Sequence, residues 1–143
     1  YNHILITTDG SDLAQRGVDQ RLSLAKVLGS KVTVVVATER FPIQVATTAP
    51  DGSEVERYDE DQKRFADELL SAVKAEAGKL GVDASTVHVA NAHPATAILE
   101  AAASYDCDLI VTAPTGGGDQ PNVEGSQTVE VLVHSHTPVL IVR

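Results

Sequence analysis

A glycine-rich loop, "TAPTGGGDQPNVEGS" at 112–126, lies between two apolar runs and contains residue types that suit anion binding. Glycine lets backbone N–H groups approach a phosphate closely, and a helix beginning near Ser126 would add partial positive charge. The loop contains no lysine or arginine, however, and it carries Asp119 and Glu124. A P-loop would need a lysine beside its final serine. On these residues alone, a phosphate-binding loop and a plain glycine-rich surface turn both remain open.

Polar residues also follow two other apolar runs. Asp9 comes directly after "HILITT", and Thr38 and Glu39 come after "KVTVVVA". A carboxylate at the end of a first strand can accept hydrogen bonds from a base or a sugar, or it can cap the helix that follows. Ligands of open α/β sheets bind beyond the carboxyl ends of the strands. These residues are therefore candidates for the same site as the loop.

Residues for catalysis or metal binding are not evident. The five histidines have no cysteine or acidic partners at ligand spacing, and the chain has no G-x-S-x-G elbow. His93 precedes Pro94 at a helix start, where it is either a boundary residue or a donor toward the strand ends. The single cysteine, Cys107, adjoins an apolar strand, which predicts a near-core thiol in a reducing compartment. We predict no catalytic residue and no metal site.

The elements that would position these residues alternate along the chain. Apolar, β-branched runs predict strands covered on both faces at 3–8, 31–37, 85–91, 108–113 and 138–143. Apolar residues at helical spacing predict helices from Ser11 to Leu28, from about Asp59 to Leu80, from Pro94 to Ser104 and from Ser126 to Ser135. The order predicts an α/β fold: a doubly wound, five-stranded parallel sheet with helices on both faces, Rossmann-like in type. We expect residues 1–143 to form a single domain.

Local signals support these helix boundaries. Ser11 suits an N-cap, Gly29 and Gly81 stand where a left-handed C-cap is wanted, and Pro94 suits a first helical position. The segment after Ser126 is ambiguous, because "TVEVLV" alternates as a strand would. We predict a helix there, since a parallel crossover to the last strand requires one.

One connection, 40–58, is too long for a compact strand-to-helix loop. Pro42, Pro50 and the turn signal "PDGS" indicate irregular structure. The segment is either a lid over the strand ends or a surface excursion, and the sequence does not separate these two interpretations.

Composition limits the partners. The formal net charge of −9 opposes attraction to nucleic acid and to anionic membrane surfaces. No apolar run approaches the roughly 20 residues that a membrane span requires. We therefore predict a cytoplasmic protein with no nucleic-acid or membrane partner.

Three segments, taken in order, resemble the universal stress protein family over essentially the whole chain. They are "ILITTDGSDLAQRGVDQRLSLAKVLGSKVTVV", "HPATAILEAAASYDCDLIV" and "GSQTVEVLVHSHTPVLIVR". The resemblance implies a five-stranded α/β fold of the adenine-nucleotide-binding type, a homodimer paired through the last strand, and a role in the stress response.

The resemblance also implies a ligand, because many members bind ATP through a loop of the form G-x2-G-x9-G-[ST]. Asp9 would contact the adenosine part, the main chain near Ala37 the adenine, and the glycines with Ser126 the phosphates. The residues expected at this site are Thr7, Asp9, Ala37, Ala113, Gly116, Gly125, Ser126 and Gln127. This sequence departs from the pattern in two ways. Ala113 replaces the first glycine and is followed by Pro114. The second and third glycines of the pattern correspond to Gly116 and Gly125, and only the eight residues 117–124 separate them where the pattern has nine.

Three functions follow from this mixed evidence. The first is a dimeric stress-response module that binds ATP, with Mg²⁺ offsetting the acidic loop, or another adenine nucleotide. The second is a protein-interaction module of the same fold with a degenerate phosphate loop and no cofactor. The third, a slow nucleotide hydrolase, is least favoured because no general base is evident.

Overall fold

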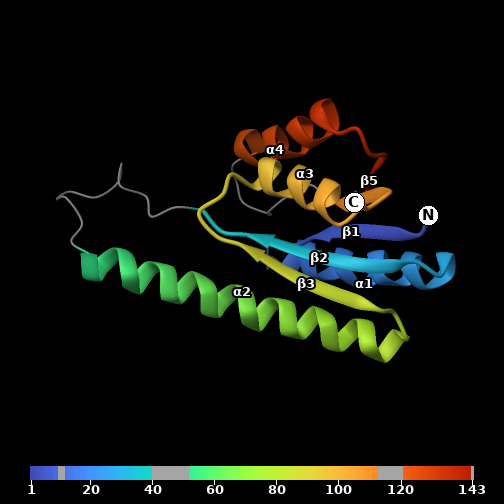
Figure 1. Ribbon diagram of the computed structural model, residues 1–143, viewed down its shortest axis with the longest axis horizontal. Helices are drawn as coiled ribbons and strands as arrows, with labels where there is room; N and C mark the ends of the chain where they lie inside the picture. The colour runs from blue at the N-terminus through green and yellow to red at the C-terminus, as the bar shows by residue number, and fades with distance from the viewer. Residues whose placement is uncertain (10–11, 40–51, 113–120, 143) are drawn as a thin grey trace.

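The computed structural model describes residues 1–9, 12–39, 52–112 and 121–142, and only the backbone of 12–16 and 121–127. The elements are β1 (His3–Thr7), α1 (Asp12–Leu28), β2 (Lys31–Ala37), α2 (Gly52–Leu80), β3 (Ala84–Val89), α3 (Pro94–Ser104), β4 (Leu109–Thr112), α4 (Pro121–His134) and β5 (Val139–Ile141). The five strands form one parallel sheet in the order β3-β2-β1-β4-β5. The predicted doubly wound α/β fold is confirmed (Figure 1).

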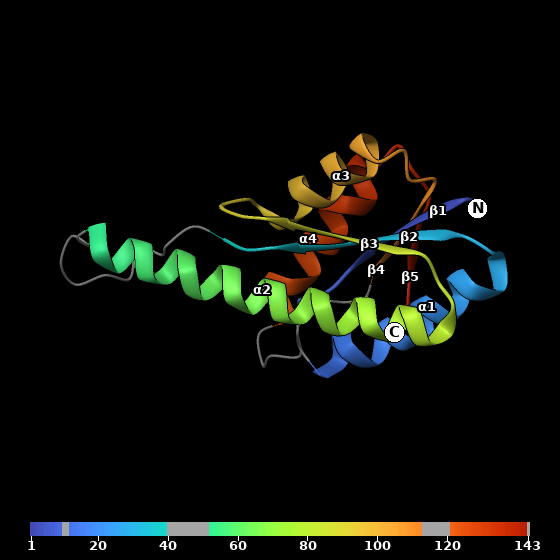
Figure 2. The ribbon, with the colours of Figure 1, turned by 60° about the horizontal axis from the view of Figure 1, so that its bottom comes forward.

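Helices cover both faces of the sheet. Figure 1 shows α3 and α4 above the strands and α2 below them, and Figure 2 shows α1 on the same side of the strands as α2. Along β1, Ile4 and Ile6 pack into the aliphatic core beneath α1 and α2, whereas Leu5 packs into the core beneath α3 and α4. Successive side chains of a strand point to opposite faces of the sheet, so neighbouring residues of β1 pack against different pairs of helices.

The strand order reverses at β1. After β1 the chain adds β2 and then β3 on one side, and it returns to place β4 and β5 on the other. The carboxyl ends of β1 and β4 therefore flank the switch point of the sheet, where open α/β folds bind ligands.

The boundaries of α1 and α3 were predicted well. Gly29, with φ of 68°, ends α1, and its successor's N–H bonds back to the Ala25 carbonyl at 3.0 Å. Gly81, with φ of 73°, ends α2 in the same way, because glycine adopts this conformation without a Cβ clash. Pro94 is at the start of α3, as predicted.

Two helix starts were predicted wrongly. The second helix begins at Gly52 rather than near Asp59, and its first turns extend past the carboxyl edge of the sheet (Figure 1). Its buried stripe begins only at Ala66, so the earlier turns have no apolar pattern to reveal them. Residues 52–58 of the supposed loop are thus helical, and the lid interpretation of the remainder lies outside the described residues.

The fourth helix begins at Pro121, five residues before the predicted cap at Ser126. Proline suits a first helical turn, but the glycine that follows at 125 disfavours a helix interior and suggested a loop. Within the described part of the chain, no helix has the length and apolar character that crossing a membrane would require.

Candidate functional site

Two threonine hydroxyls meet at the switch point. The register of β1 and β4 pairs Ile6 with Val111, and one residue further along, the Oγ1 atoms of Thr7 and Thr112 share a hydrogen bond of 2.9 Å. Leu5 and Ile110, two residues earlier on these strands, pack beneath α3 and α4, so the hydroxyls lie on that same side of the sheet. We call this region, defined by the ends of β1 and β4 on the α3/α4 side, the β1/β4 crevice, after the place at which open α/β sheets bind ligands.

An arginine lies in the interior behind the end of β1. Arg21 of α1 is fully buried, its Nε donates to the Gly17 carbonyl at 2.9 Å, and its Nη1 donates to the Thr7 carbonyl. Burial lowers the pKa of the guanidinium to about 10, and the nearby Asp9 carboxylate opposes that shift. With this pKa the side chain remains a cation at neutral pH.

Sequence analysis missed Arg21, although a signal was present. The residue stands on the apolar stripe of its helix, between the buried Val18 and Ala25 and beside Leu22. A charged residue on a core stripe needs a partner that offsets the cost of its burial. The glycine-rich segment contains no lysine or arginine, and the topology instead brings Arg21 to the end of β1 from a neighbouring helix.

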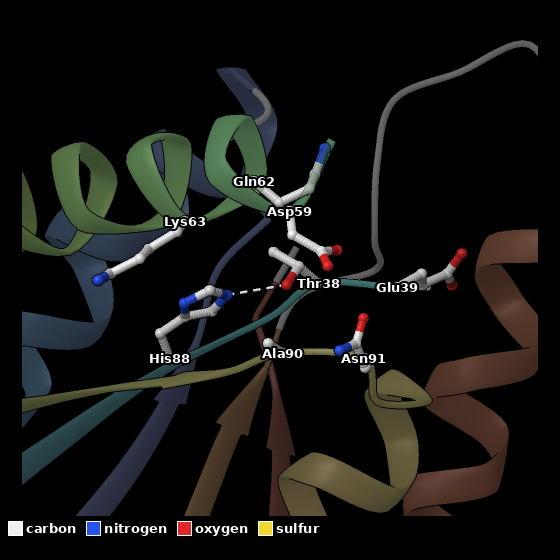
Figure 3. A pocket seen from close by; sticks show the side chains of 8 residues that line it. All are labelled: Thr38, Glu39, Asp59, Gln62, Lys63, His88, Ala90 and Asn91. Atoms are coloured by element: carbon white, nitrogen blue, oxygen red, sulfur yellow. Dashed lines mark hydrogen bonds between the residues drawn. The ribbon is translucent and has the colours of Figure 1, made fainter. Parts of the chain in front are cut away.

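A hollow lies at the ends of β2 and β3, on the other side of the sheet. It has a volume of about 230 Å³, and its lining residues are Thr38, Glu39, Asp59, Gln62, Lys63, His88, Ala90 and Asn91 (Figure 3). His88 projects to this side because its neighbours Val87 and Val89 pack beneath α3 and α4. Its Nε2 shares a hydrogen bond of 2.8 Å with the Thr38 hydroxyl. We call this hollow the α2-side cleft.

The α2-side cleft has a polar floor and an exposed rim. Asp59 and Lys63 extend from α2 and Glu39 from the segment after β2, and all three residues are exposed (Figure 3). The Tyr58 hydroxyl donates to the Glu39 carbonyl at 3.3 Å, which ties the start of α2 to the end of β2. Charges on this rim are solvated, so they attract ligands weakly.

The described contacts of His93 and His3 link neighbouring elements of the fold. His93 Nε2 lies 2.8 Å from Glu130 Oε2 and so links α3 to α4, while both side chains remain about half exposed. His3 Nε2 shares a hydrogen bond of 2.7 Å with the Thr33 hydroxyl. Among the residues that the structure describes, no three histidine, cysteine or acidic side chains come together to hold a metal ion.

The start of β4 holds a thiol and a carboxylate in contrasting environments. Cys107 is buried, and burial together with Asp108 and Asp106 raises the pKa of its thiol to about 11. The predicted near-core thiol is thus confirmed. Asp108 accepts hydrogen bonds from the backbone N–H groups of Asn2 at 2.8 Å and His3 at 3.0 Å, and these bonds lower the pKa of its carboxyl.

The predicted nucleotide site is only partly within the described residues. Thr7 and Ala37 end adjacent strands and Asp9 follows the first of them, so these three lie at one edge of the sheet. Ala113 and Gly116 lie outside the described residues. Gly125, Ser126 and Gln127 fall inside α4, so Ser126 does not stand at the start of the helix as predicted.

The fold and the site define the class: a doubly wound α/β domain with polar groups at the switch point of its sheet and a buried cation behind them. The family model of the universal stress proteins matches residues 1–143, and the chain belongs to that family.

Individual relatives agree with this assignment. A universal stress protein of Thermus aquaticus is 32% identical over 145 residues, covering 100% of this chain and 99% of the relative. The solved structure of a universal stress protein from Lactobacillus plantarum has a TM-score of 0.77 at 24% identity and covers 100% of this chain and 98% of its own. A universal stress protein solved in complex with cAMP has a TM-score of 0.70 at 25% identity, with coverage of 100% and 97%.

Proposed function

We propose that the protein binds an adenine nucleotide in the β1/β4 crevice and acts as a cytoplasmic, dimeric stress-response module. The observation that carries this proposal is the pair of Thr7 and Thr112 hydroxyls at the switch point, whose oxygen atoms are 2.9 Å apart. Asp9 follows β1 and lies at the same carboxyl edge of the sheet. Hydroxyl and carboxylate groups suit the hydrogen-bonding edges of a base and a ribose. The relative solved with cAMP supports the same ligand class.

The acidic residues of the loop bear on which nucleotide is bound. Asp119 and Glu124 would repel a triphosphate, so we propose that Mg²⁺ accompanies ATP if ATP is the ligand. We assign no catalytic residue, because none of the described side chains in the crevice stands out as a general base. Slow hydrolysis would be measured as phosphate release above that of buffer.

A change in thermal midpoint tests nucleotide binding directly. A ligand at one hundred times its dissociation constant adds about 2.7 kcal/mol of stability, which raises the midpoint of a domain of this size by several degrees. We expect Mg-ATP, ADP or AMP to produce such a shift. Asp9→Ala should reduce the ligand-induced shift, whereas Asp59→Ala on the α2-side cleft should leave it unchanged.

The alternative function, a protein-interaction module with an empty site, is favoured by the loop itself. Pro114 has no N–H to offer a phosphate, and the loop is shortened between Gly116 and Gly125. If none of the three nucleotides moves the midpoint, this second function takes the place of the first.

The dimer is proposed at β5. This strand is at the edge of the described sheet, and it carries one exposed apolar side chain, Leu140. The helix before it, α4, exposes three more: Val129, Leu132 and Val133. An exposed edge strand, together with exposed apolar side chains nearby in the chain, suits pairing with a second copy. Val133→Lys should lower the mass in sedimentation from dimer to monomer. Val27→Lys, on an apolar residue of α1 that is 84% exposed, is the matched control and should leave the dimer intact.

A further inference from the structure

We infer that Arg21 is a positioning residue that sets the charge preference of the β1/β4 crevice, so that nucleotides with more phosphates are bound more tightly. This inference rests on the proposed nucleotide-binding function and names the group that makes the site suitable for an anion. Arg21 would act from the interior, through the end of β1 and through Asp9, without touching the ligand.

Negative charge dominates the residues around the proposed site. The chain has a net charge of −9, and residues 112–126, which lead from the end of β4 into α4, include two acidic residues and no basic one. Asp9 adds a further negative charge at the end of β1. A phosphate approaching this edge would therefore meet repulsion unless a cation stood nearby. Among the buried side chains that the structure describes, Arg21 alone carries a charge.

The contacts of Arg21 hold its guanidinium at the carboxyl end of β1. Two of its N–H groups donate to backbone carbonyls, those of Gly17 and Thr7, and the second of these belongs to the last residue of β1. Carbonyl oxygens satisfy the donors but are neutral, so they leave the positive charge in place. The Asp9 carboxylate is near enough to stabilise the charged form of the guanidinium. Arg21 thus offsets Asp9 and holds the strand end from which Asp9 projects.

The glycine one turn earlier in α1 leaves space for this arrangement. A Cβ placed on Gly17 would lie 2.6 Å from Arg21 Nη2 and 3.3 Å from its Nε. Glycine is unfavourable inside a helix, yet this one is buried in the middle of α1. Any larger residue at position 17 would push the guanidinium away from the Thr7 carbonyl. Gly17 and Arg21 therefore form a matched pair.

The experiment compares ligands that differ only in phosphate number. Dissociation constants for adenosine, AMP, ADP and ATP are measured by calorimetry at one salt concentration, for the wild type and for Arg21→Met, Arg21→Lys and Gly17→Ala. Methionine keeps much of the length without charge, and lysine keeps the charge without the planar fork. Gly17→Ala keeps the arginine but displaces it, so it serves the test even if Arg21→Met does not fold.

We expect Arg21→Met to weaken ATP binding at least tenfold and adenosine binding less than threefold. Arg21→Lys should retain part of the ATP preference, and Gly17→Ala should lose part of it. Adding Asp9→Asn to Arg21→Met should restore part of the ratio of ATP to adenosine affinity, because it removes the charge that Arg21 had offset. A purely structural role would not predict this rescue.

Two results overturn the inference and leave the proposed function standing. In the first, the wild type binds nucleotides and Arg21→Met keeps the same preference for ATP over adenosine. In the second, Arg21→Met weakens ATP and adenosine equally, which makes Arg21 a structural residue. If the wild type binds none of the four ligands, the proposed function fails, and this inference fails with it.

Discussion

The two halves of the sheet's carboxyl edge present polar groups in opposite ways. At the end of β1 and β4, the hydroxyls and the guanidinium are held inside the protein by neighbouring strands and by α1. At the end of β2 and β3, the Thr38 and His88 side chains are held in this way, whereas the rim charges of Glu39, Asp59 and Lys63 stand in solvent. Polar groups fixed in a dry environment interact more strongly than solvated ones. The first half is therefore suited to recognise a ligand, although the hollow that the structure describes lies at the second.

The topology explains this difference. Strands β1 and β4 lie inside the sheet, with neighbours on both sides, whereas β3 is at its edge. All four residues of β4 are buried, but only the first residue of β3 is. Since helices cover β1 and β4 on both faces, a polar group there must find partners within the protein. The same group on β3 can turn to water.

The largest expected effect is a difference in stability between the two halves. Arg21→Ala leaves two carbonyls without their donor and a cavity beneath α1, so we expect the free energy of unfolding to fall by about 3 kcal/mol. His88→Ala removes one half-buried hydrogen bond and should cost only about 1 kcal/mol. Urea denaturation of both variants gives the comparison. Equal losses would mean that burial does not distinguish the two ends.

A smaller effect is expected from the hydroxyl pair. Thr7→Val or Thr112→Val removes the hydrogen bond between the two hydroxyls, at a cost of about 1 kcal/mol, whereas removing both hydroxyls should cost little more than removing one. The double-mutant cycle measured by urea denaturation would then give a coupling energy of about 1 kcal/mol. Strict additivity would show that the 2.9 Å contact contributes nothing.

The opposite end of the same strands gives a pH-dependent effect. Hydrogen bonds from Asn2 and His3 lower the pKa of the Asp108 carboxyl in the folded state. Its contribution is therefore complete above the unfolded pKa, near 3.9, and is lost as pH falls through the lower folded value. Asp108→Asn should reduce stability at pH 7 and flatten the acid limb of the stability curve. An unchanged acid limb would contradict the assignment.

The smallest effect is expected at the surface contact between α3 and α4. His93 and Glu130 are 51% and 45% exposed, and exposed pairs contribute roughly 0–1 kcal/mol because solvent screens them. Glu130→Gln should change the free energy of unfolding by less than about 0.5 kcal/mol at pH 7. A loss comparable to that of Arg21→Ala would show that this link, rather than the buried residues, fixes α4.

The sequence predicted those parts of the molecule whose residues carry a pattern. The strands and the buried stripes of α1 and α2 follow from apolar spacing, and the end of α1 follows from Gly29. The first turns of α2 could not be predicted, because they project past the sheet and bury no stripe. The start of α4 was obscured by a proline and a glycine that also suit a loop.

The candidate site was less predictable than the fold. Asp9 was expected at the edge of the sheet because it follows a predicted strand, and Thr7 was expected there from the family resemblance. The contact between Thr7 and Thr112 depends on which strands are neighbours, and that order is decided by tertiary packing. The position of Arg21 depends likewise on how α1 packs behind β1. Such groups become visible only when distant segments are brought together.

The most direct test of nucleotide binding at the ends of β1 and β4 is to map by NMR which backbone amides respond to ATP, with Mg²⁺ present. We expect the signals of Thr7, Thr8 and Asp9 to shift on titration, while those of Gln62 and Lys63 at the α2-side cleft stay in place. Shifts confined to the α2-side cleft, or no shifts at all, would contradict nucleotide binding in the β1/β4 crevice.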